Sequence, residues 1–119
     1  MNAIQTRILV VDDEPDVGDF LKRYLSLRSF KVETAFSAEQ ALKLLEKENV
    51  DIILLDLIMH GMSGMEAAKI IREKFPSVKI IVITGCPSEA ENLKAQVRLD
   101  GIFIKPVGIQ ELYIKLTQV

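Results

Sequence analysis

The chain has 119 residues, of which 49% are hydrophobic and 27% are charged. Its 15 Lys and Arg residues stand against 17 Asp and Glu residues, a formal net charge of −2 that argues against a generally basic nucleic-acid-binding protein. The length suits one domain with a real core, and the many Ile, Leu and Val residues exclude a disordered chain. We therefore expect one domain over residues 1–119 without direct nucleic-acid binding.

Cysteine usage and apolar runs bear on the compartment. The single Cys86 excludes an internal disulfide and a Cys-rich zinc site, which fits a reducing compartment. Residues 1–7 lead into only four apolar residues, too few for a secretion signal. The longest nearly apolar stretch, 50–59, contains two aspartates and is unsuited to span a bilayer. We expect a soluble, cytoplasmic protein with no membrane contact.

The first third of the chain predicts two strand–helix pairs. Residues 8–11 form an apolar strand pattern, and Pro15 begins a helix, as proline does in a first turn. A strand over 31–35 follows, and then a helix over 38–48. Before this second helix, Ser37 and Gln40 have the spacing of an N-cap and its capping box.

The remaining segments continue the same alternation. The apolar runs 52–55 and 78–83 indicate strands buried on both faces, and a helix over 65–75 lies between them after two glycines. Ser88 is the expected cap of a weaker helix over 89–99, and the chain closes with a strand and a helix. These last two elements are predicted at residues 102–104 and 109–116.

Five strand–helix units predict an α/β fold, a doubly wound parallel sheet with helices on both faces. The most apolar strands belong in the middle and the more polar strands, 31–35 and 102–104, at the edges. The expected strand order is therefore 2-1-3-4-5, the flavodoxin-like arrangement.

Polar residues follow the strands at their carboxyl ends, where open α/β sheets bind their ligands. Taken singly, each has an ordinary explanation as a turn residue, a cap or a surface lysine. Asp56 is harder to explain in this way, because it closes the most buried run, where an unpaired charge is costly. Together they predict one site, built from Asp12, Asp13, Glu14, Asp56, Thr84, Gly85, Lys105 and Pro106.

The charges of this group indicate its chemistry. Three carboxylates repel one another, and the single Lys105 does not offset them, whereas a divalent cation with oxygen ligands would. An Asp beside Mg²⁺ and a Lys can attack phosphorus and form an aspartyl phosphate. The residues therefore favour Mg²⁺-dependent phosphoryl transfer to an aspartate.

Four segments in this order and spacing resemble the receiver domain of bacterial two-component response regulators, over the chain from Arg7 to the last helix. Each segment alone is a weak pattern, but the ordered set is highly specific. The segments are ILVVDDEP, IILLDLIM-x-GM-x-G, IVITG and IKP.

The resemblance implies that Asp56 accepts a phosphoryl group from a histidine kinase, a phosphotransfer protein or a small phosphodonor. It implies that Mg²⁺ is bound by Asp13 directly, by Asp12 through water, by the acceptor itself and by the backbone carbonyl of Ile58. Thr84 would hydrogen-bond a phosphoryl oxygen beside the small Gly85. The family also implies that Lys105 pairs with the phosphoryl group, commonly with a cis bond to Pro106.

Phosphorylation in this family biases a two-state surface. The resemblance places that surface on the fourth helix, fifth strand and fifth helix, for a partner or a second copy of the chain.

The sequence departs from the family at a few positions. Ile102 stands where the family usually has a switch aromatic, and the adjacent Phe103 points to the opposite face by the period of two. His60 replaces a frequent proline and is best interpreted as a loop residue without a chemical role. Cys86 is interpreted as a small filler. The segment 84–105 is about one residue short, so the fourth helix is expected to be short or irregular.

Three other functions remain as alternatives. A Mg²⁺-dependent phosphohydrolase would carry a second Asp where Ile58 stands, and the chain has no room for a cap domain. A flavodoxin-like nucleotide binder would need a Ser/Gly-rich phosphate loop, whereas residues 12–14 are acidic. A receiver that binds partners without phosphorylation stays open because of Ile102.

Overall fold

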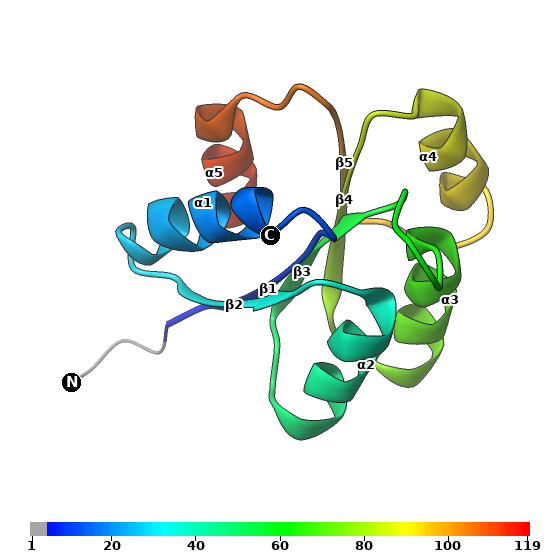
Figure 1. The fold of residues 1–119 in the computed structure, drawn as a ribbon, viewed down its shortest axis with the longest axis horizontal. Helices are drawn as coiled ribbons and strands as arrows, with labels where there is room; N and C mark the ends of the chain where they lie inside the picture. Colours follow the sequence, from blue (N-terminus) through cyan, green and yellow to red (C-terminus); the bar gives the residue numbers. More distant parts are fainter. Residues whose placement is uncertain (1–4) are drawn as a thin grey trace.

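Strands and helices alternate strictly along residues 5–119, the part of the chain that the computed structural model describes (Figure 1). The strands are β1 (Arg7–Val11), β2 (Lys31–Ala35), β3 (Ile52–Asp56), β4 (Lys79–Thr84) and β5 (Gly101–Ile104). The helices are α1 (Pro15–Ser26), α2 (Ala38–Lys47), α3 (Gly64–Lys74), α4 (Pro87–Lys94) and α5 (Ile109–Gln118).

The strands form one parallel sheet in the order β2-β1-β3-β4-β5. Helices α1 and α5 cover one face, and α2, α3 and α4 cover the other (Figure 1). This arrangement confirms the predicted fold class and strand order. In it, β1 and β3 are inner strands whose carboxyl ends lie side by side.

The core lies in two layers because each inner strand is buried on both faces. Along β3, Ile53 and Leu55 pack into the layer under α2, α3 and α4, whereas Ile52 and Leu54 pack into the layer under α1 and α5. Successive strand residues face opposite sides of a sheet, so both layers draw on one continuous apolar run. At about 25 cal/mol per Å², burial of this kind is the main favourable contribution to folding.

The predicted N-cap of α2 is present, but the Gln40 side chain bonds a different backbone N–H than a capping box predicts. The Ser37 hydroxyl accepts a hydrogen bond from the Gln40 N–H at 3.1 Å. The Gln40 amide oxygen in turn accepts from the N–H of Phe36, at 2.8 Å, rather than from that of Ser37. The helix therefore begins where the sequence predicts.

The prediction for α4 was wrong in its bounds, although it was right that this helix is short. The helix covers Pro87–Lys94 with Cys86 at the N-cap position, and Ser88 lies in its first turn. Proline is suited to a first helical position, which explains the early start.

Beyond α4 the chain is held as a loop by Arg72 of α3. The Arg72 guanidinium donates to the carbonyl of Arg98 at 2.7 Å and to the Asp100 carboxylate at 3.1 Å. The apolar residues Val97 and Leu99 still pack against the core, but from this loop rather than from a helix.

No helix among residues 5–119 combines the length and the hydrophobicity that crossing a membrane requires. The expectation that no secretion signal is present rests partly on residues 1–4, which lie outside the described part of the chain.

Candidate functional site

The predicted site residues lie at the carboxyl ends of four strands. Asp12 directly follows β1, Asp56 is the last residue of β3, Thr84 is the last residue of β4, and Lys105 directly follows β5. Residues 12 and 56 meet because β1 and β3 are parallel neighbours, with Val11 paired to Leu55. The topology thus brings together residues that are far apart in the sequence.

Three carboxylates form the centre of the site. Asp12, Asp13 and Asp56 each place a carboxylate oxygen within 4.8 Å of the others. Asp12 and Asp56 are only 4% and 7% exposed, and Asp13 is half-buried. Carboxylates packed this closely repel one another unless a cation is present.

Local backbone hydrogen bonds fix the two buried carboxylates. Oδ1 of Asp12 accepts from the N–H of Glu14 at 2.9 Å, and Oδ1 of Asp56 accepts from the N–H of Ile58 at 3.2 Å. Each Asp thereby closes the turn that follows its own strand.

Gly64 allows the first turn of α3 to approach the backbone of Asp56 and Leu57. A Cβ at Gly64 would clash with the Asp56 carbonyl oxygen and would lie 2.6 Å from Cα of Leu57. The Gly64 N–H also donates to the carbonyl of Leu57 at 3.1 Å. The loop 57–63 is thus closed tightly over the end of β3.

Lys105 supplies the positive charge that the two buried carboxylates share. Its Nζ lies 3.3 Å from Oδ2 of Asp56 and 3.5 Å from Oδ2 of Asp12. Burial by itself would lower the pKa of Lys105, but the negative charges of Asp56 and Asp12 outweigh it and raise that pKa. The ammonium therefore stays charged at neutral pH.

Asp56 shows the opposite balance. Burial raises the pKa of its carboxyl group, and the nearby charge of Asp12 raises it further, against the lowering effects of the Ile58 N–H and of Lys105. The ionised Asp56 is therefore destabilised in the folded chain, and added positive charge at this site would relieve that cost.

His60 makes a contact that the sequence did not predict. Its backbone N–H donates to Oδ2 of Asp13 at 3.0 Å, and its ring Nδ1 lies 2.8 Å from the same oxygen. These contacts, the backbone one first, lower the pKa of Asp13. Because 47 positions separate the two residues, no local sequence signal could have revealed the pair.

Thr84 lies beside the acidic centre at the end of β4 and is completely buried. Its hydroxyl accepts a hydrogen bond from the N–H of Cys86 at 3.1 Å, so it is already engaged in the loop before α4. The thiol of Cys86 is in turn 3.3 Å from the Ser88 hydroxyl, which lowers the pKa of the thiol.

The peptide bond between Lys105 and Pro106 is cis.

Ile102 and Phe103 lie as the alternation predicts. Ile102 packs on the side of the sheet covered by α2, α3 and α4, whereas Phe103 packs on the side of α1 and α5. No aromatic side chain therefore occupies the usual position three residues before Lys105.

The donor set of the site fits Mg²⁺. The three carboxylates offer hard oxygen ligands, and the one partly buried ammonium leaves part of their negative charge uncompensated. This combination favours a hard dication. The backbone carbonyl of Ile58 belongs to the turn that begins at Asp56.

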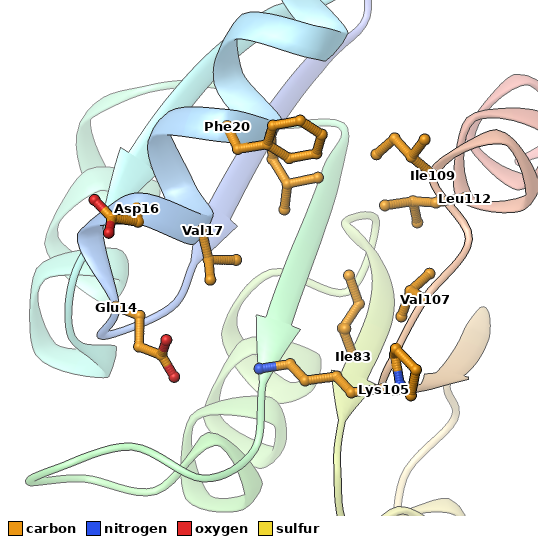
Figure 2. A pocket seen from close by; sticks show the side chains of 11 residues that line it. Glu14, Asp16, Val17, Phe20, Ile83, Lys105, Val107, Ile109 and Leu112 are labelled. Carbon is orange, nitrogen blue, oxygen red and sulfur yellow. The ribbon is translucent and has the colours of Figure 1, made fainter.

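An apolar groove of about 650 Å³ opens beside Lys105, between α1 and α5 (Figure 2). Glu14 and Asp16 lie at its α1 end, and Phe20, which is 56% exposed, stands opposite Ile109. A large apolar side chain of another protein would gain from burial here.

The family profile described as the response regulator receiver domain matches residues 8–117. The transcriptional regulatory protein YvrH of Bacillus subtilis is 37% identical over 111 residues, which cover 92% of this chain and 46% of that protein. The chain spans about half the length of the first curated relatives it matches.

Solved structures give the same likeness. The response regulator TrrA of Thermotoga maritima, solved with Mg²⁺–BeF, is 36% identical with a TM-score of 0.87, covering 96% of this chain and 98% of that one. A CheY-like receiver domain of Methanospirillum hungatei is 28% identical with a TM-score of 0.92, covering 97% and 93%.

Proposed function

Because this chain belongs to the response regulator receiver family, we propose that Asp56 is its phosphoacceptor and that phosphorylation there switches the domain. The observation that carries this assignment is the position of the Asp56 carboxylate, buried at the end of β3 with Lys105 Nζ at 3.3 Å. Receiver domains of response regulators are phosphorylated by histidine kinases, so the donor we propose is a histidine kinase or a phosphotransfer protein.

The proposed step is a displacement at phosphorus. A carboxylate oxygen of Asp56 forms a bond to the phosphorus of a phosphohistidine, and the phosphorus–nitrogen bond breaks, with its electron pair returning to the imidazole. Lys105 is placed to pair with the incoming phosphoryl oxygens. We propose that the chain performs only this self-phosphorylation and the later loss of its phosphoryl group, without turnover of other phosphate esters.

We assign Mg²⁺ binding to Asp13, Asp56 and the backbone carbonyl of Ile58, with Asp12 acting through water. When bound, the ion offsets the charge of the carboxylates and of the incoming phosphoryl oxygens. The cluster of oxygens within 4.8 Å supports this assignment, and so does the raised pKa of Asp56, which reflects burial together with uncompensated negative charge.

The proposed switch begins at Thr84. A phosphoryl group on Asp56 offers strong acceptor oxygens, and we propose that the Thr84 hydroxyl turns toward them and releases the N–H of Cys86, which lies directly before α4. The affected surface is formed by α4, β5 and α5, where Ile104 and Ile114 are exposed. Its partner would be an output segment, another protein or a second copy of the chain.

The groove between α1 and α5 is where we place the phosphodonor protein. It opens beside Lys105, and its apolar lining with acidic residues at one end suits an amphipathic helix carrying basic residues (Figure 2). A small donor such as acetyl phosphate needs no such surface, so it tests the chemistry of the site separately from docking.

The experiment that tests the assignment is intact-mass analysis after incubation with acetyl phosphate, with and without Mg²⁺. We expect one Mg²⁺-dependent phosphoryl adduct on the wild-type chain and none on an Asp56→Asn variant. Asp51→Asn is the matched control, because Asp51 precedes the opposite end of β3 and is exposed. Labelling of Asp56→Asn would overturn the acceptor assignment, and an unlabelled wild-type chain would overturn the proposed function.

A further inference from the structure

His60 is the only histidine of the chain, and it lies against a proposed metal ligand. Its ring Nδ1 is 2.8 Å from Oδ2 of Asp13. The histidine side chain is fully exposed, so little packing holds the ring in this one position. Gly61, which follows it, has a φ of 77°, a left-handed conformation that turns the loop back at this point.

The spacing of these two atoms allows two different arrangements. At 2.8 Å they can share a proton, as a hydrogen bond does. Two donors bound side by side to one octahedral cation, each at about 2.1 Å from it, would lie about 3 Å apart. The separation of Nδ1 of His60 and Oδ2 of Asp13 therefore already suits a shared metal ion, toward which the exposed ring would have to turn.

The chemistry of an imidazole makes this second arrangement selective. Mg²⁺ prefers oxygen ligands and keeps several of its waters, so a nearby ring nitrogen gives it little. Imidazole is a good ligand for Zn²⁺, Ni²⁺ and other late transition-metal dications, whose affinity for nitrogen ligands is far higher than that of Mg²⁺.

We propose that His60 determines the cation preference of this site, as an added ligand that favours late transition-metal dications over Mg²⁺. The inference rests on the acidic site of the proposed function and extends it. Such an ion would be held by the imidazole of His60 together with the carboxylates around Asp13. Mg²⁺ would be held without the imidazole. In this way a loop residue changes which dication the site selects.

The test compares Ni²⁺ and Mg²⁺ binding, by calorimetry at one fixed pH, in the full chain without a histidine tag. His60→Gln keeps a polar side chain but removes the imidazole. We expect this variant to bind Ni²⁺ about tenfold more weakly or worse, and Mg²⁺ within about twofold of the wild-type chain. Asp13→Asn is the matched control, because losing a shared carboxylate should weaken the binding of both ions.

A second readout reports the ring directly. Because the chain has one histidine, its imidazole proton signals in an NMR spectrum are unambiguous. Paramagnetic Ni²⁺ should broaden these signals at substoichiometric amounts, before Mg²⁺ is added in excess.

Several results would overturn the inference. One is an unchanged Ni²⁺ affinity in His60→Gln, and another is a set of ring signals that Ni²⁺ leaves unaffected. A third is an equal loss of affinity for both ions, which would make His60 a positioning residue for Asp13. Failure of the proposed acidic metal site looks different, because the wild-type chain would then bind no Mg²⁺ and Asp13→Asn would change nothing, whereas failure of the phosphoacceptor assignment shows as an unlabelled wild-type chain with acetyl phosphate.

Discussion

Two opposing effects act on the ionisation of Asp56. Burial and the neighbouring Asp12 raise its pKa above the ordinary value of 3.8, against the Ile58 N–H and Lys105, which favour the ionised form. The folded chain therefore holds a proton on Asp56 more tightly than the unfolded chain does. By linkage, this residue lowers the free energy of unfolding as pH rises from below 3.8 through the raised pKa.

Asp56→Asn should consequently raise the Tm of the metal-free chain at pH 7, because the amide carries no charge to desolvate. An increase of a few degrees is expected, since about 1 kcal/mol shifts the Tm of such a domain by about 4 °C. The difference should disappear in acid, where Asp56 of the wild-type chain is protonated. Thermal unfolding in EDTA across this pH range measures it.

Asp19→Asn provides the comparison, because Asp19 is exposed on α1. This substitution should leave the Tm nearly unchanged both at pH 7 and in acid. A lower Tm for Asp56→Asn at pH 7 would mean that the pairing of Asp56 with Lys105 outweighs the cost of burial.

At the scale of elements, the start of α3 determines how closely the following loop packs on Asp56 at the end of β3. Gly64 lies against the backbone of Asp56 and Leu57, where there is no space for a Cβ. The close approach closes the loop that carries Ile58 and His60 over the end of β3.

Gly64→Ala should therefore push α3 away from β3 and lower the free energy of unfolding by about 1–3 kcal/mol, the usual cost of overpacking. Urea unfolding checks the value. Gly85→Ala is the matched control, since a Cβ there has no neighbouring atom within 4 Å and should cost little. Equal effects of the two substitutions would contradict this account of the loop.

At the scale of the whole molecule, the acidic site links the ends of β1 and β3, two inner strands of the sheet. A cation held there binds the folded chain and not the unfolded one, so it stabilises the entire cooperative unit.

Mg²⁺ should raise the Tm of the wild-type chain, and EDTA should reverse the change. At a Mg²⁺ concentration of about 100 times Kd, the expected gain is about 2.7 kcal/mol. Asp13→Asn should show a clearly smaller rise, and a Tm that does not respond to millimolar Mg²⁺ would argue against a metal site. Differential scanning calorimetry provides the measurement.

The sequence by itself determined the strand order, the two-faced burial of β3 and the edge of the sheet that carries Asp56 and Lys105. It could do so because alternation, capping and apolar runs are local patterns, and because parallel strands place their carboxyl ends together whatever the details of packing. The faces of Ile102 and Phe103 followed from the same period of two.

Only the tertiary structure decided the course of the loop after α4 and the contact of His60 with Asp13. Past the end of α4, the Arg72 guanidinium of α3 donates to the carbonyl of Arg98 and fixes the loop there. The His60 contact joins residues 47 positions apart through a loop turned at Gly61. Both contacts join segments that are distant in the sequence, and they arise from tertiary packing rather than from any periodicity in the chain.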